Sequence, residues 1–266
     1  VEGVKSGTQR MLGDAQSLEL AVICFINGLD RERADVDATL ASLESLDVKP
    51  VLLAMPIGNE ASLSGVVDLV HMKAVSADGS ESEIPADLKE EAESRREQLV
   101  ESVAECDDAL LERYLEDGEL GAEDVLRGLA SGIRSRAIMP VLCGSALSEV
   151  GVDLMLREIK EIFPSPEARG AWEAVSVDGG DEVTADPSPE APLSAVVFKT
   201  IYDRYAGTLS VLRVVSGTLS HDTAVLNASR DKKTRVGKLM ILKGEEHEDV
   251  PMAGPGDVVA VAKLKD

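Results

Sequence analysis

The chain has 266 residues, of which 44% are hydrophobic, and this is enough for two domains with separate cores. Its 49 acidic and 27 basic residues give a formal charge of −22, which argues against binding DNA or RNA by phosphate neutralisation over the whole surface. No apolar run reaches membrane-spanning length, and no signal-peptide pattern begins the sequence. Three scattered histidines and three widely spaced cysteines lack metal-ligand spacing, so we expect a reduced, cytoplasmic protein without a metal site. From the charge and the absence of long apolar runs we expect neither a DNA partner nor a membrane partner.

Residues 21–26 form a continuous apolar run, which is typical of a strand buried in a parallel sheet. The run ends in Asn27-Gly28-Leu29-Asp30, and the carboxyl ends of such strands are where open α/β sheets bind ligands. An Asn offers both a donor and an acceptor, and an ionised Asp offers acceptors only. This pair suits a guanine base, although Asn-Gly as a turn and Asp30 as a helix N-cap explain the segment without a ligand.

Helices predicted at 5–18 and 34–46 flank this strand, and a further short strand is expected at 51–56. Together they predict a Rossmann-like parallel sheet. An insertion of about 57–136 follows, with a hairpin over 57–75, a long helix over 88–117 and a shorter helix over 122–131. Between Ser76 and Arg127 lie 18 acidic and 5 basic residues. They form either a solvated helix face or a docking surface for a protein partner.

Residues 137–143 are a second buried parallel strand, and it ends in Gly144-Ser145-Ala146. Small residues at this point let backbone N–H groups approach a base carbonyl, although a tight turn also explains them. A helix over 152–162 closes the unit, and residues 173–191 are expected to form an exposed linker. The remainder predicts a small β-barrel, with strands at 193–203, 208–217, 223–229, 233–242 and 257–264.

Several of these segments resemble the translational GTPases of the elongation factor G family. NGLD is similar to the N-K-x-D motif for guanine specificity, with Gly28 in place of the family lysine, and CGSAL is similar to the last guanine-contacting motif. GVVDLVHMKA resembles the start of the insertion in the family's G domain, and RVVSGTL resembles the opening of the barrel domain. The resemblance implies the C-terminal part of a P-loop GTPase sheet at 1–172 with an α+β insertion, followed by the barrel domain II at 192–266.

The resemblance implies a site for GTP or GDP whose guanine contacts are Asn27, Asp30, Ser145, Ala146 and Leu147. It assigns no catalytic residue to this chain, which lacks a G-x-x-x-x-G-K-[ST] loop, so the phosphate and Mg²⁺ ligands are expected in sequence before Val1. We therefore expect an internal piece of a longer protein that does not hydrolyse GTP by itself.

The family likeness implies a ribosome-associated GTPase that drives translocation. Ribosomal RNA of the small subunit is the expected partner of Lys232, Lys233 and Arg235, and a ribosomal stalk protein that of the acidic insertion. Because Gly28 thins the base pocket, a non-hydrolysing ribosome-binding paralogue stays open as an alternative. So do a ribosomal protection or release-factor GTPase and an unrelated α/β binding module.

Overall fold

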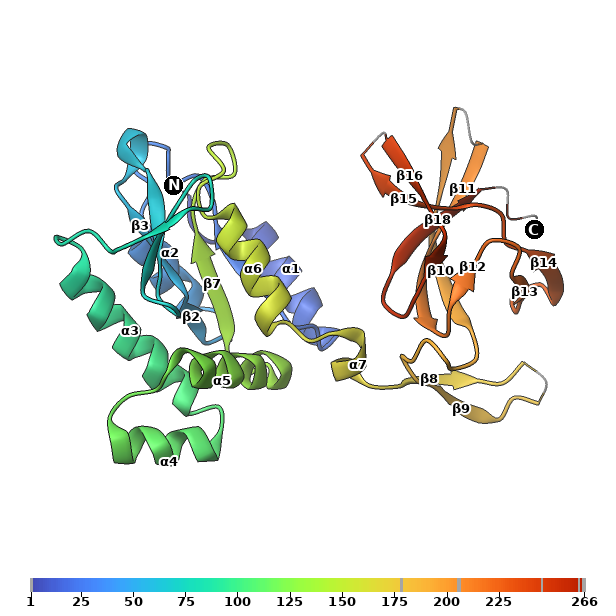
Figure 1. Cartoon of the computed structure of the whole chain (residues 1–266), viewed down its shortest axis with the longest axis horizontal. Coiled ribbons are helices and arrows are strands. Elements are labelled where there is room, and N and C mark those ends of the chain that lie inside the picture. The colour runs from blue at the N-terminus through green and yellow to red at the C-terminus, as the bar shows by residue number, and fades with distance from the viewer. Residues whose placement is uncertain (1, 178, 205–206, 245, 263, 265–266) are drawn as a thin grey trace. The chain divides into compact units, whose positions relative to one another are not determined.

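The computed structural model describes residues 2–177, 179–204, 207–244, 246–262 and 264 (Figure 1). They divide into two compact units, Val1–Pro164 (unit 1) and Ser165–Asp266 (unit 2). Among the described residues, no helix combines the length and apolar character needed to cross a membrane.

A three-stranded parallel sheet forms one part of unit 1, as the sequence predicts. Its strand order is β1-β7-β2, so the last of the three strands in sequence lies in the middle. All five residues of this central strand are buried, which explains its continuous apolar run. The strands are β1 (Cys24–Ile26), β2 (Pro50–Leu52) and β7 (Met139–Cys143), and the helices that precede or follow them are α1 (Ser6–Ser17), α2 (Val36–Glu44) and α6 (Val152–Ile162).

The insertion adds a four-stranded antiparallel sheet and three helices to unit 1. The hairpin predicted over 57–75 is present, and the sheet extends beyond it by one strand on each side, in the order β3-β4-β5-β6. The elements are β3 (Ala54–Ile57), the 3-10 turn η1 (Glu60–Ser62), β4 (Gly65–Asp68), β5 (Lys73–Ser76), β6 (Glu81–Ser82), α3 (Lys89–Ala104), α4 (Asp108–Asp117) and α5 (Ala122–Ser135).

The single long helix predicted over 88–117 is wrong, because α3 and α4 are separate helices. The first helix ends at Ala104, and Asp107 is the N-cap of the second. Its carboxylate accepts hydrogen bonds from the backbone N–H groups of Ala109 (3.0 Å) and Leu110 (3.1 Å). An aspartate in this position satisfies donors that a helix N-terminus leaves unpaired.

One hydrophobic core joins the two sheets of unit 1. The chain passes from β2 to β3 through Leu53, whose N–H donates to the carbonyl of Val141 in the parallel sheet at 2.8 Å. The carbonyl of Leu53 in turn accepts the N–H of Leu69 at 3.0 Å, on the antiparallel side. The insertion is therefore packed against the parallel sheet and shares its core, so a defect in one sheet destabilises the other.

Unit 2 begins with a short helix and a hairpin that lie partly in the segment predicted as a linker. Residues 173–191 hold most of β8 (Trp172–Val175) and all of β9 (Glu182–Ala185), which pair antiparallel, after α7 (Pro166–Arg169). The guanidinium of Arg169 lies 3.9 Å from the centre of the Trp172 ring. The described residues of this segment are mostly exposed, and they carry secondary structure of their own.

The rest of unit 2 is an antiparallel β domain, in agreement with the predicted all-β region. Its main sheet has the order β10-β11-β18-β15-β16, and two ribbons, β12–β17 and β13–β14, accompany it. The single strand predicted at 233–242 is wrong, because residues 236–238 separate β14 from β15. The strands are β10 (Ser194–Asp203), β11 (Gly207–Ser216), β12 (Leu219–Ser220), β13 (Ala224–Asn227), β14 (Lys232–Arg235), β15 (Leu239–Lys243), β16 (Glu246–Val250), β17 (Met252–Ala253) and β18 (Val258–Ala262).

Candidate functional site

The carboxyl ends of β1 and β7 meet at one edge of the parallel sheet. The two strands pair in parallel with Ile26 opposite Cys143, so Asn27 and Gly144 follow at the same level. Three hydrogen bonds tie the segments together: Gly144 N–H to Ile26 O (3.0 Å), Leu29 N–H to Gly144 O (3.0 Å) and Ala146 N–H to Asn27 Oδ1 (2.9 Å). Residues 119 positions apart in sequence thus form a single loop cluster.

An open groove of about 560 Å³ lies over this cluster. Four of the five residues expected to contact guanine line it, namely Asn27, Asp30, Ser145 and Leu147. The fifth, Ala146, is joined to Asn27 by the hydrogen bond just described. The remaining lining residues are Glu2, Gly28, Arg31 and Glu32.

Asn27 and Ser145 also form hydrogen bonds that shape the loops after β1 and β7. The side-chain oxygen of Asn27 is occupied by the N–H of Ala146, which leaves the Asn27 amide nitrogen as the group available to donate. A base carbonyl would therefore compete with Asn27 for that backbone N–H. Ser145 is fully buried and builds the turn, because its N–H donates to Val150 O (3.0 Å) and its Oγ accepts from Ser148 N–H (3.3 Å).

Gly28, at the position of the family lysine, has a left-handed backbone with φ of +82°. A side chain would be strained in this conformation, which glycine adopts without cost. The place that a Cβ would take is 3.6 Å from Cδ of Arg31, so the aliphatic part of Arg31 lies beside the glycine. Arg31 thus contributes apolar surface next to the groove, where the sequence alone shows only a missing side chain.

The charges that line the groove favour an uncharged part of a ligand over a phosphate group. Its lining holds three carboxylates, those of Glu2, Asp30 and Glu32, and one cation, Arg31. A phosphate group would meet net negative charge there, whereas the N–H edge of a base would find acceptors.

Glu60 was not identified from the sequence, yet it supports the loop after β1. Its N–H donates to Leu29 O (2.9 Å) and its carboxylate accepts the N–H of Arg33 (2.8 Å). The residue comes from η1 in the insertion and itself has a left-handed backbone, with φ of 47°. No local pattern marks such a residue, since its role depends on a contact across about 30 positions of sequence.

The three basic residues expected to contact RNA lie together on β14 in unit 2, and all three are exposed. Since side chains alternate along a strand, Lys233 and Arg235 share one face of the β13–β14 ribbon and Lys232 lies on the other. Arg235 also donates to the carbonyl of Asp222 at 3.3 Å. Lys233 and Arg235 are therefore the two residues that one phosphate-binding face of this ribbon would use together.

Comparisons with known proteins agree with this architecture. Residues 192–266 match the family model of elongation factor G domain 2. A crystal structure of a protein from Thermus thermophilus is similar over 99% of this chain, with a TM-score of 0.82 and 27% sequence identity. The chain spans 37% of the length of that protein. The findings support a chain similar to translation elongation factors of the elongation factor G type, with an α/β unit followed by a β domain.

Proposed function

We propose that this elongation factor G-like chain is the guanine-recognising part of a longer GTPase that acts on the ribosome. The observation that carries the proposal is the meeting of Asn27, Asp30 and Ser145 in one groove at the carboxyl edge of a parallel sheet. Open α/β sheets bind ligands at this edge. The acidic lining suits the base and not the phosphates, so the proposal assigns this groove to the base alone.

In this proposal the β domain and the insertion bind the ribosome, and GTP hydrolysis by the whole protein drives translocation. Domain 2 of elongation factor G is the family that residues 192–266 match, which supports a role in translation. The acidic insertion, with α3, α4 and α5, is the proposed surface for the ribosomal stalk protein.

Asp30→Asn is expected to reverse the base preference of the groove from guanosine to xanthosine. An Asp carboxylate accepts from two N–H groups of guanine, whereas an Asn amide replaces one acceptor by a donor, which the extra carbonyl of xanthine satisfies. Losing a hydrogen bond to a charged group costs about 1.5–3 kcal/mol, or roughly 10- to 150-fold in affinity. The measurement is amide chemical-shift titration of the labelled chain with millimolar guanosine, xanthosine and adenosine, since we expect weak binding without phosphate contacts.

Glu32→Gln is the matched control, because Glu32 lines the same groove and the substitution makes the same change of charge. It should keep the preference for guanosine. An Asp30→Asn chain that still prefers guanosine over xanthosine, or a wild-type chain whose groove amides respond equally to adenosine, would refute the proposed base recognition.

Charge reversal at Lys232, Lys233 and Arg235 is expected to weaken binding to small ribosomal subunits and to reduce its dependence on salt. Each lost phosphate contact lowers the slope of log K against log salt by about 0.7–0.9. Because Lys233 and Arg235 share one face, we expect these two residues to make most of the phosphate contacts. The magnitude of the slope should then decrease by about 2. Filter binding over a salt series measures the slope. Reversing three exposed cations of unit 1, Lys89, Arg134 and Lys160, is the control for net charge, and an equal slope in both triple variants would contradict a specific RNA surface on β14.

A further inference from the structure

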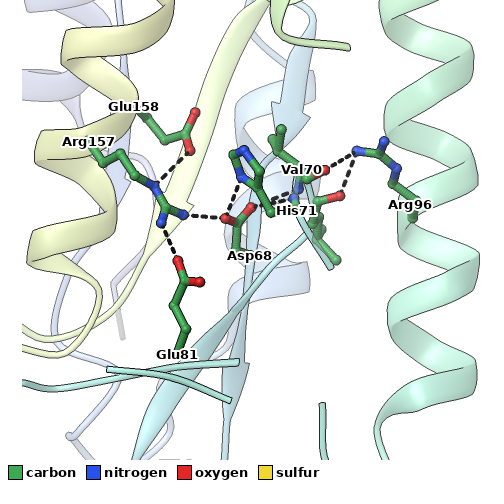
Figure 2. A network of polar contacts seen from close by, with 8 residues as sticks. Asp68, Val70, His71, Glu81, Arg96, Arg157 and Glu158 are labelled. Carbon is green, nitrogen blue, oxygen red and sulfur yellow. Dashed lines mark hydrogen bonds and ion pairs between the residues drawn. The ribbon is translucent and has the colours of Figure 1, made fainter. Parts of the chain in front are cut away.

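A cluster of ionisable side chains lies between the β4–β5 turn and α6, and none of its members lines the guanine groove. Figure 2 shows Asp68, His71 and Glu158 facing one space, with Arg157 beside them. Asp68 ends β4, His71 lies in the turn after it, and Glu158 projects from α6. One ligand atom from each of the three lies within 4.8 Å of the others.

Asp68 is fully buried and holds the turn in shape. Its Oδ1 accepts the N–H groups of Val70 (2.8 Å) and His71 (3.1 Å). Its Oδ2 contacts Nδ1 of His71 at 2.9 Å and the Nη2 group of Arg157. The backbone hydrogen bonds fix the carboxylate in place, and the second oxygen is directed toward α6 (Figure 2).

Glu158 is also fully buried, but neither of its carboxyl oxygens has a hydrogen-bond partner within the part of the chain that the structure describes. The nearest cation, Nε of Arg157, is 3.9 Å from Oε1, which is too far for a hydrogen bond. Burial, followed by the nearby Asp68 carboxylate, raises the pKa of Glu158 to about 8. Two buried carboxyl groups side by side, one of them without a partner, need either a proton or a cation between them.

We propose that Asp68, His71 and Glu158 bind one divalent transition-metal ion, for which Zn²⁺ is the best match. An imidazole nitrogen and two carboxylate oxygens are ligands that Zn²⁺ accepts at about 2.0–2.2 Å, whereas Ca²⁺ and Mg²⁺ prefer oxygen ligands alone. Ligand atoms around one such ion are about 3.4 Å apart, so small side-chain rotations suffice from the observed spacing. Metal coordination would replace the contact between Nδ1 of His71 and Oδ2 of Asp68.

Arg157 competes with the metal for Asp68. The metal displaces its guanidinium from Asp68 Oδ2, but Nη1 of Arg157 keeps its ion pair with Glu81 at 2.7 Å. The displaced arginine therefore has a partner close by. The bound ion would join the insertion sheet to α6 and stabilise unit 1.

The test uses Co²⁺ and Zn²⁺ titrations of the whole chain, followed by absorption spectroscopy and calorimetry. We expect one ion per chain, a Co²⁺ spectrum without thiolate charge-transfer bands, and a higher thermal midpoint of helix unfolding when Zn²⁺ is present. Glu158→Gln and His71→Gln should each weaken binding about 10-fold or more. Asp68 is left unchanged, because its replacement would also remove the hydrogen bonds that shape the turn.

Glu161→Gln, an equal change of charge at an exposed position of the same helix, is the control and should bind the metal as the wild type does. Equal affinity of the Glu158→Gln variant and the wild type would overturn the proposal, as would a cobalt spectrum with thiolate bands from Cys24, Cys106 or Cys143. If Glu158→Gln does not fold, as judged by far-UV circular dichroism, His71→Gln decides, because its side chain is one-third exposed and tolerates exchange. These readouts are independent of nucleotide binding.

Discussion

Replacing Gly144 by alanine is expected to destabilise unit 1 by about 3 kcal/mol or more, a large effect for one methyl group. The added Cβ would overlap the carbonyl oxygen of Val150 and lie 3.0 Å from the Phe25 ring. Neither neighbour can move easily, since the N–H of Ser145 donates to that carbonyl and Phe25 belongs to β1. The strain would separate the loop after β7 from Asn27, so we expect the groove proposed to bind guanine to be lost as well.

Urea unfolding followed at 222 nm measures this change, because α1 to α6 all belong to unit 1. Gly13→Ala is the matched control, since Gly13 lies within α1 and its Cβ would meet open space. That exchange should stabilise the helix by up to about 1 kcal/mol. A Gly144→Ala chain as stable as the wild type would show that the loop after β7 does not need glycine there.

The parallel sheet and the meeting of its strand ends could be predicted from the sequence because their signals are local. Continuous apolar runs at β1 and β7 indicate buried strands, and α6 begins and ends at the residues predicted. Asn27 and Ser145 could be placed together for the same reason, since parallel strands end at the same edge of a sheet. Tertiary contacts then changed the role of Asn27, whose oxygen is used by Ala146.

Two features were not predicted, namely the break between α3 and α4 and the meeting of Asp68 with Glu158. The break at Asp107 carries a local capping signal, but an apolar stripe on both sides of it favours one long helix. Asp68 and Glu158 are far apart in sequence and come together only when α6 packs beside the insertion sheet. Glu158 occupies a fully buried position on a helix, which hydrophobic patterning would assign to an apolar residue.

Arg96→Met is expected to destabilise unit 1 by about 2–4 kcal/mol, since hydrogen bonds to charged groups contribute about 1.5–3 kcal/mol and the carbonyls would lose their donor. Arg96 projects from α3 and donates to the carbonyls of Leu69 (2.8 Å) and Val70 (2.9 Å) (Figure 2). It also donates to the carbonyl of Leu120 at 3.3 Å. It therefore connects α3 with the β4–β5 turn and with the segment before α5. Methionine keeps the length of the side chain and its apolar packing, so the loss reports on the hydrogen bonds.

The same urea unfolding experiment measures the effect, with Arg134→Met as the control. Arg134 is an exposed residue of α5, and its replacement should change the free energy of unfolding by no more than about 0.5 kcal/mol. Because Arg96 holds the turn that carries Asp68 and His71, Arg96→Met should also weaken Zn²⁺ binding although it touches none of the proposed ligand atoms. An Arg96→Met chain with wild-type stability would mean that water replaces the guanidinium at all three carbonyls, and the turn would then owe its shape to Asp68 alone.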